Sequence, residues 1–231
     1  MTTFVLVHGA HLGPWSWNLV ISSLNRRGHR AINIDLPVSE TSFGAADYAA
    51  SIVKQIELSQ SKEDLVIVGH ALAGLAIPLL ADKVPVRKFI YIAPLIPLPG
   101  HSIQTRLKTS ESDMFLAARR PDPIANRADT FKYWLHDCEP DIAYWAAARL
   151  RPQHFETMIN EVTPLKKIPT VSTEVIICTN DRLINSTWAQ KASRTILNTE
   201  PISIDSGHCP QLSRPQELSL LLMQLGNARN K

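Results

Sequence analysis

Two side chains of this sequence have the types and positions that proton transfer requires, and a third position stands where a nucleophile would complete the set. Asp181 and His208 each follow an apolar run that predicts a buried strand, and Ala71 follows a third such run. A hydroxyl, a carboxylate and an imidazole in this chain order catalyse acyl transfer through a covalent intermediate. The carboxyl ends of parallel strands meet at one edge of a sheet, so we expect the three positions to converge.

The segment around Ala71 has the pattern of a strand, a tight turn and a helix. A β-branched run at residues 65–68 leads into G-H-A-L-A-G at residues 69–74. This is the arrangement of a nucleophile elbow, in which the central residue of G-x-S-x-G is a serine. Alanine has no hydroxyl and forms no acyl-enzyme. Either a serine has been replaced at position 71, or the chain is a natural protein that lost or changed this chemistry.

The remaining parts of an acyl-transfer site are present. Asp181 would hold one tautomer of His208, and His208 would act first as general base and then as general acid. The tripeptide His8-Gly9-Ala10 follows the first predicted strand, where a glycine lets the chain turn closely. The backbone N–H groups of Ala10 and Leu72 would then donate to a developing oxyanion, and each such donor contributes about 3 kcal/mol in enzymes of this kind.

These residues also have simpler interpretations. Asp181 is compatible with a helix N-cap, and His208 with a surface loop. Asp35 follows another predicted strand and is a rival acid, although a turn residue is the simpler interpretation. Asp205 is so close to the histidine along the chain that we interpret it as a local residue. Single histidines near the predicted pocket are more often hydrogen-bonded structural residues, and this applies to His11, His70 and His101.

No neighbouring side chain is a good substitute for the missing hydroxyl. Cys209 and Ser206 lie beside His208 in sequence, and adjacent side chains in an extended loop point apart. A water molecule activated by His208 is the remaining source of slow hydrolysis.

Strand and helix patterns alternate along most of the chain. They predict an α/β fold with a mostly parallel sheet of about six strands and helices on both faces, formed by residues 1–93 and 171–231. The predicted strands are residues 3–7, 30–34, 64–68, 86–92, 174–178 and 202–204, and the predicted helices are residues 14–27, 45–59, 71–81, about 187–193 and 215–225.

Residues 94–170 interrupt this alternation, because prolines divide them into short segments without a buried-strand pattern. A structureless connection of this length is uncommon in a compact domain, so we predict a helical lid inserted into the core. Its aromatic residues favour an apolar pocket beneath it. We predict substrate contacts from Trp15, His70, His136, Tyr144 and Trp145.

The composition is that of an ordinary globular protein. The 231 residues are 45% hydrophobic and 19% charged, with a net charge of +3 and no basic run longer than a pair, which argues against nucleic-acid binding. Three cysteines fit free thiols in a reducing compartment, and we see no signal peptide or membrane span. We therefore expect a cytoplasmic protein without membrane partners, and a homodimer is one option. Neither a metal nor another cofactor is expected, because ligand-spaced His or Cys clusters and a phosphate-binding glycine loop are missing.

Together the motifs resemble the α/β-hydrolase superfamily, and most closely its branch of methylesterases and hydroxynitrile lyases with their small bacterial relatives. The resemblance covers nearly the whole chain. It implies a serine carboxylic-ester hydrolase with a Ser-His-Asp triad, acting on a small hydrophobic ester such as a methyl or short-alkyl ester of an aromatic or terpenoid-like acid. The motifs are V-H-G-A-x-x-G-P-W-x-W at residues 7–17, D-L-P at 35–37, L-A-G-L at 72–75, P-x-P-G at 97–100, T-x-D-R at 179–182 and G-H-x-P-x-L-S-R-P-x-E-L at 207–218.

The chain departs from this family at a few positions. Ala71 in place of the serine is the serious departure, whereas Ala73 in place of the second elbow glycine is small enough to be tolerated. Hydroxynitrile lyases of this branch carry a lysine after the catalytic histidine and a threonine in the oxyanion turn. The residues here are Cys209 and Gly9, which favours the esterase side.

Three functional hypotheses follow. The first is a serine esterase present as an inactive Ser→Ala form. The second is a natural serine-less enzyme, such as a lyase, a cofactor-free oxygenase or a cyclase, that uses His208 and Asp181 as an acid–base pair. The third is a non-catalytic ligand-binding protein on the same scaffold. Fold alone does not choose among them.

Overall fold

The protein is built around one parallel sheet. The computed structural model describes residues 1–61, 64–116 and 122–228. Six strands lie in the order β2-β1-β3-β4-β5-β6, and every neighbouring pair is parallel, which confirms the predicted fold class. The order reverses direction between β1 and β3, and ligands of such sheets bind at the strand ends beside this switch point. The strands are β1 (Thr3–Val7), β2 (Arg30–Ile34), β3 (Leu65–His70), β4 (Val86–Ile92), β5 (Ser172–Cys178) and β6 (Ile202–Ile204).

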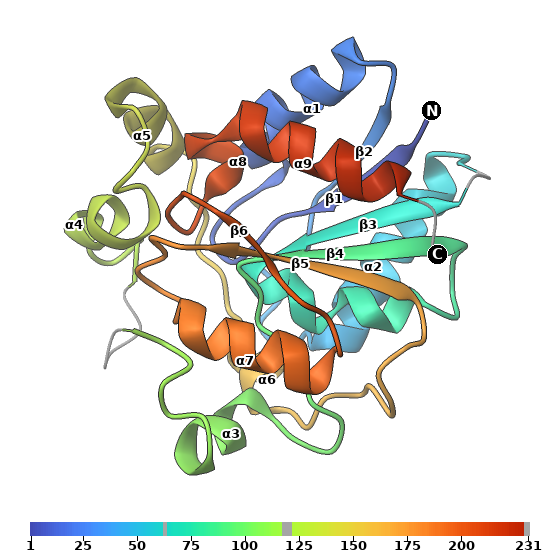
Figure 1. The fold of residues 1–231 in the computed structure, drawn as a ribbon. Coiled ribbons are helices and arrows are strands. Elements are labelled where there is room, and N and C mark those ends of the chain that lie inside the picture. Colours follow the sequence, from blue (N-terminus) through green and yellow to red (C-terminus); the bar gives the residue numbers. More distant parts are fainter. Residues whose placement is uncertain (62–63, 117–121, 229–231) are drawn as a thin grey trace.

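Helices cover both faces of the sheet (Figure 1). On one face, α1 (Asn18–Arg26) and α9 (Pro215–Asn227) pack against alternate side chains of the central strands. On the other face lie α2 (Ala45–Leu58) and α7 (Ser186–Ile196). The central strands are buried on both sides, which explains their nearly continuous β-branched sequence. The first predicted helix begins as a 3-10 turn, η1 (Pro14–Trp17), and the short helix α8 (Pro210–Ser213) was not predicted.

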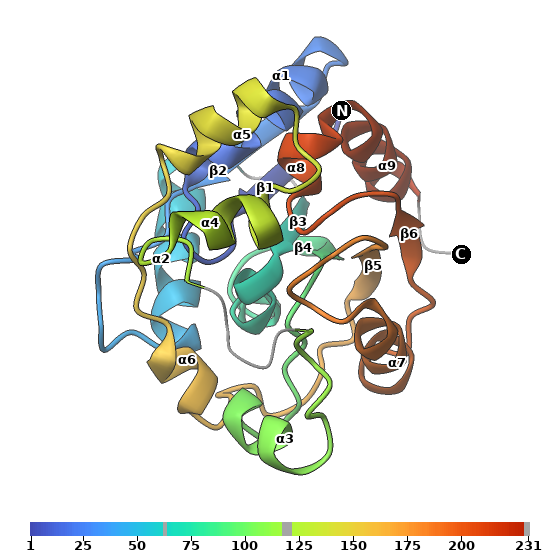
Figure 2. The same cartoon turned by 90° about the vertical axis from the view of Figure 1, so that its left-hand side faces the viewer.

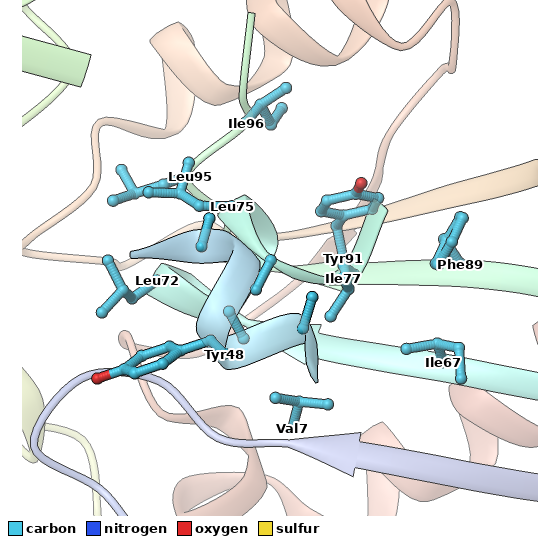
Figure 3. Close-up of a cluster of buried hydrophobic side chains, with 14 of the residues drawn as sticks. Val7, Tyr48, Ile67, Leu72, Leu75, Ile77, Phe89, Tyr91, Leu95 and Ile96 are labelled. Atoms are coloured by element: carbon cyan, nitrogen blue, oxygen red, sulfur yellow. The ribbon is translucent and has the colours of Figure 1, made fainter. Parts of the chain in front are cut away.

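The prediction of one helix over residues 71–81 is wrong. Two short 3-10 helices, η2 (Ala71–Leu75) and η3 (Ile77–Leu80), occupy this segment. Pro78 has no N–H to donate, and its ring excludes the carbonyl group four residues earlier, so an α-helix does not continue through it. The side chains of Leu72 and Leu75 nevertheless join the buried cluster beside Leu95, as Figure 3 shows.

The segment from residue 94 to residue 170, here called the 94–170 segment, connects β4 to β5. Its described part holds helices and, apart from the isolated bridge of Phe115 with Ile184, no β-pairing. Figure 2 shows these helices in an arc around the ends of the strands. The division into core and lid stays a prediction. The helices are α3 (Ile103–Thr109), α4 (Arg127–Asp129), the π-turn η4 (Thr130–Trp134), α5 (Pro140–Ala147) and α6 (Glu156–Asn160).

A search of the described residues for membrane-spanning helices found none of sufficient length and apolar character.

The turn after β3 approaches the backbone after β4 closely enough to require a glycine. A β-carbon added to Gly74 would press on the carbonyl oxygen of Leu95. We expect Gly74→Ala to lower the free energy of unfolding by about 2 kcal/mol, because rigid backbone has to move. Gly28→Asn is the matched control, since Gly28 has φ +76° and open space around it, and we expect a loss below about 1 kcal/mol. Equal losses in urea unfolding of the two variants would contradict this explanation.

Candidate active site

Three strand ends bring the predicted catalytic positions to one cavity. Ala71 follows β3, Asp181 follows β5 and His208 follows β6. Ala71 and His208 both line a cavity that encloses about 640 Å³, its open mouth included. The other lining residues are mostly apolar, which suits a hydrophobic ligand. They are Ala10, His11, Leu72, Leu95, Phe115, Trp134, Phe155, Ile159, Leu183 and Ile184.

Asp181 and His208 form a buried pair. The Nδ1 atom of His208 lies 2.7 Å from Oδ2 of Asp181, and their side chains are 6% and 2% exposed. The other oxygen of Asp181 accepts the backbone N–H groups of Leu183 and Ile184 at 2.7 and 3.1 Å. Since the carboxylate holds the proton of His208 on Nδ1, the other ring nitrogen is left as a base. Asp181 is therefore more than a local cap, because one of its oxygens binds the N–H groups of the turn and the other binds the imidazole.

Ala71 adopts the backbone conformation of a nucleophile elbow. Its φ is +49°, in the left-handed region that non-glycine residues seldom occupy. Its carbonyl oxygen accepts the N–H of Leu95 at 3.1 Å, which helps to hold the turn. An alanine in this conformation costs on the order of 1 kcal/mol. The elbow is thus maintained although position 71 carries no hydroxyl.

The loop after β1 lies against the elbow. Ala10 and Leu72 both line the cavity, and Leu72 is the second residue of η2, where backbone N–H groups precede the first intrahelical bond. A β-carbon on Gly9 would lie 2.7 Å from Nδ1 of His70 and 3.1 Å from Cβ of Ala71, so only glycine permits this approach. Ala10 and Leu72 therefore reach the same cavity from two neighbouring loops, and their role as an oxyanion hole stays a prediction.

His8 stabilises the same loop through two hydrogen bonds. Its Nδ1–H donates to the carbonyl oxygen of Gly9 at 2.9 Å, and its Nε2 accepts the N–H of Leu36 at 3.1 Å. Burial lowers the pKa of His8, which keeps the ring neutral as this pattern requires. Arg151 joins the loop to Asp35, with a nitrogen–oxygen distance of 2.8 Å. Asp35 is 56% exposed and bound in this way, so it does not replace Asp181 as the partner of His208.

His70 is a structural residue in this geometry. It is fully buried, does not line the cavity, and donates from Nε2 to the carbonyl oxygen of His208 at 2.7 Å. Burial, and next the nearby His208, lower its pKa well below the ordinary value. The geometry therefore does not support the predicted substrate contact. Instead, His70 ties the elbow to the loop that carries His208.

The 94–170 segment holds the loops that carry Asp181 and His208 through two adjacent residues. His136 donates from Nε2 to the carbonyl oxygen of Asn180 at 3.0 Å, beside Asp181. Asp137 accepts the N–H of Gly207 at 2.6 Å, beside His208. His136 was predicted to contact substrate, but it does not line the cavity. We call His136 and Asp137 the loop clamp.

Trp15, Tyr144 and Trp145 are not among the residues that line this cavity, so their contact with a substrate stays a prediction. Trp15 packs edge-on against Trp145 with ring centroids 5.3 Å apart, and Tyr144 is 61% exposed. The cavity takes its aromatic side chains from Phe115, Trp134 and Phe155 instead. The lining residues Leu183 and Ile184 had a usable signal in the sequence, because they stand two and three positions after the acid.

The alternative nucleophiles are buried and do not line the cavity. Cys209 is fully buried, and burial raises the pKa of its thiol well above the usual range. Ser206 is also fully buried. Neither residue lines the cavity. Asp205 lies in an exposed hydrogen bond with Asn180, in agreement with a local role.

The chain has relatives along nearly its whole length. The family model described as "Alpha/beta hydrolase family" matches residues 4–219. Salicylic acid-binding protein 2 of Nicotiana tabacum is 25% identical, over 98% of this chain and 98% of its own length. Methylesterase 3 of Arabidopsis thaliana is 24% identical, over 96% of this chain and 95% of its own length.

Solved structures share the fold. Polyneuridine aldehyde esterase has a TM-score of 0.80 at 19% identity, covering 98% of this chain and 100% of that chain. Tomato Methylketone Synthase I, complexed with 2-tridecanone, has a TM-score of 0.76 at 23% identity, covering 98% of each chain.

The buried neutral histidines predict a loss of stability in acid. The folded-state pKa of His70 lies below the unfolded value of about 6.5, so unfolding takes up a proton and stability falls as the pH drops below that value. One such histidine contributes a slope of up to about 1.4 kcal/mol per pH unit. We expect His70→Gln to reduce the pH dependence of the free energy of unfolding between about pH 6 and 5. An unchanged slope in His70→Gln would refute the assignment.

The loop clamp predicts a graded effect at Asp137. Asp137→Ala leaves the buried N–H of Gly207 without its acceptor, so we expect a loss of about 1–3 kcal/mol in the free energy of unfolding. Asp137→Asn keeps an acceptor oxygen and should lose less than half as much. Urea unfolding of the two variants measures this, and two variants as stable as the parent chain would show that the clamp is unimportant.

Proposed function

This chain belongs to the α/β-hydrolase family, on its methylesterase-like branch, and we propose that its cavity is the site of a serine carboxylic-ester hydrolase whose nucleophile position carries Ala71. In this proposal the site binds a small hydrophobic ester and polarises its carbonyl group. The chain as it stands forms no acyl-enzyme. A serine at position 71 would restore the triad with Asp181 and His208.

The observation that carries this proposal is the strained elbow beside an intact acid–base pair. The φ of +49° at Ala71 costs stability, and a strained turn of this kind is the conformation in which a nucleophile elbow holds its central residue. The conformation does present the side chain of residue 71 to the cavity that His208 also lines. Backbone strain of this kind is found at functional sites, where it positions a reacting group.

The proposed reaction follows from the hydrogen bonds of the pair. A serine hydroxyl at position 71 would lose its proton to Nε2 of His208 as its oxygen attacks the ester carbonyl. The carbonyl oxygen would become an oxyanion held by the N–H groups of Ala10 and Leu72. His208 would then protonate the leaving alcohol, and water would release the acid by the reverse sequence. Asp181 would keep the imidazole in the required tautomer throughout.

The substrate class follows from the cavity lining and from the relatives. Leu95, Ile159 and Leu183 among others make the walls apolar, and none of the described lining residues is an aspartate, glutamate, lysine or arginine. A tobacco salicylic acid-binding protein and an Arabidopsis methylesterase are among the relatives. These observations support a methyl or short-alkyl ester of a small hydrophobic acid. The 94–170 segment would act as the lid over it.

A second candidate is a natural enzyme that needs no serine. The pair of His208 and Asp181 is complete in the chain as it stands, with the base nitrogen left free by the tautomer. A methylketone synthase shares the fold, so a non-hydrolytic activity on this scaffold has a precedent. In that case His208 would move a proton to or from a bound hydrophobic ketone or acid in a lyase, cofactor-free oxygenase or cyclase reaction. A purely ligand-binding protein would make no use of the pair.

Restoring the hydroxyl tests the proposal. We expect Ala71→Ser to hydrolyse at least one member of a panel of p-nitrophenyl and methyl esters at least about a thousand-fold faster than the parent chain, since removal of a triad serine costs up to about a million-fold. Adding His208→Ala to Ala71→Ser should abolish the gain. The measurement is initial rate against ester concentration for the three proteins.

Rate and affinity measurements on these variants separate the three hypotheses. No gain in Ala71→Ser on any ester would contradict the esterase proposal. A reaction of the parent chain that His208→Ala abolishes would establish the serine-less enzyme. Ligand affinity that is unchanged by His208→Ala and by Asp181→Asn, without any turnover, would indicate the binding protein.

A further inference from the structure

His11 places a second imidazole in the wall of the apolar cavity. Among the described lining residues, only His11, His208 and the indole of Trp134 have polar side chains. His208 is hydrogen-bonded to Asp181, whereas the imidazole of His11 takes no part in the proposed reaction. It stands next to Ala10, whose N–H group belongs to the proposed oxyanion hole. A polar group at this point of the cavity would contact a ligand close to its reacting carbonyl.

The hydrogen bonds of His11 determine which ring nitrogen carries the proton and which is left to accept. Its N–H donates to Oε1 of Gln153 at 2.9 Å, and its carbonyl oxygen accepts the N–H of Arg151 at 2.8 Å. Its Nδ1 lies 3.1 Å from the carbonyl oxygen of Arg151. A carbonyl oxygen only accepts, so Nδ1 carries the ring proton. Nε2 is therefore left with a lone pair, and none of the hydrogen bonds between described residues uses it.

Several contacts fix the orientation of the His11 ring. His11 has a φ of +62°, which is unusual for a residue with a side chain. Its ring meets Trp134 and Phe155 edge-on, with centroid distances of 6.1 and 5.7 Å. The residue is 7% exposed. Three hydrogen bonds to residues 151 and 153 and two aromatic contacts thus hold one orientation of a polar ring in an apolar wall.

We propose that Nε2 of His11 accepts a hydrogen bond from a hydroxyl group of the ligand, so that the site selects hydrophobic esters that carry a hydroxyl near the ester carbonyl. The inference rests on the proposed function and names the class of substrate for that site. Burial lowers the pKa of His11, so the ring is neutral and able to accept at neutral pH.

The selectivity has a simple physical origin. An ester without a hydroxyl displaces water from Nε2 and leaves a buried acceptor unpaired, whereas a hydroxylated ester replaces the lost hydrogen bond. Sites of this kind discriminate against the analogue that lacks the polar group more strongly than apolar walls discriminate by size.

Binding to the chain with Ala71 tests the inference without turnover. Titration calorimetry compares methyl phenylacetate with methyl mandelate and the three methyl hydroxyphenylacetates, which share one carbon skeleton. We expect at least one hydroxylated ester to bind about fivefold more tightly or better than methyl phenylacetate, as one additional hydrogen bond predicts. Equal affinities throughout the series would overturn the inference and leave the esterase proposal standing. Failure of every ester to bind would overturn both.

Variants of His11 assign the preference to this residue. His11→Phe keeps a ring between Trp134 and Phe155 but has no acceptor, and His11→Asn tolerates the left-handed backbone but is too short to reach. The readout is the ratio of the two affinities, so a general weakening of binding cancels. We expect the ratio to fall to about one in both variants, while the control His101→Phe, outside the cavity, keeps the parent ratio. A preference that survives in both His11 variants would overturn the inference.

Discussion

The buried hydrogen bond between His208 and Asp181 is the interaction on which the rest of the site depends. A carboxylate that is 2% exposed is expensive to bury unless its oxygens are hydrogen-bonded. The structure meets this need with two backbone N–H groups on one oxygen and the imidazole, at 2.7 Å, on the other. Both partners stand on loops rather than on strands. The loops must therefore be held by other elements, and the loop clamp and His70 hold them.

A second constraint is the elbow at the end of β3. Its left-handed residue has to be supported by close packing, because alanine does not favour the conformation on its own. Gly9 and Gly74 give this packing by letting the loop after β1 and the backbone after β4 approach. The same approach brings Ala10 beside Leu72 at the cavity. Site geometry and core packing are thus one arrangement, and this arrangement does not depend on a hydroxyl at position 71.

The sheet and the convergence of Ala71, Asp181 and His208 could be predicted because they depend on local patterns. Buried strands have continuous β-branched runs, and residues after parallel strands share one edge. The lining of the cavity could not be predicted, because the orientation of the short helices of the 94–170 segment depends on distant packing partners. The substrate contacts of Tyr144 and Trp145 stay predictions. His70 and His136 are polar residues near the site whose bonds to backbone carbonyls no sequence pattern reveals. The helix over residues 71–81 failed for a local reason that was visible, namely Pro78.

A crystal structure of the chain with a bound hydrophobic methyl ester tests the central claim most directly, since Ala71 lets the ester persist. The account predicts an intact ester whose carbonyl oxygen lies about 2.7–3.1 Å from the backbone nitrogens of both Ala10 and Leu72, with Nε2 of His208 facing the same carbonyl group. An ester bound in the cavity with its carbonyl oxygen turned away from these two N–H groups, or an ester bound elsewhere on the protein, would contradict it.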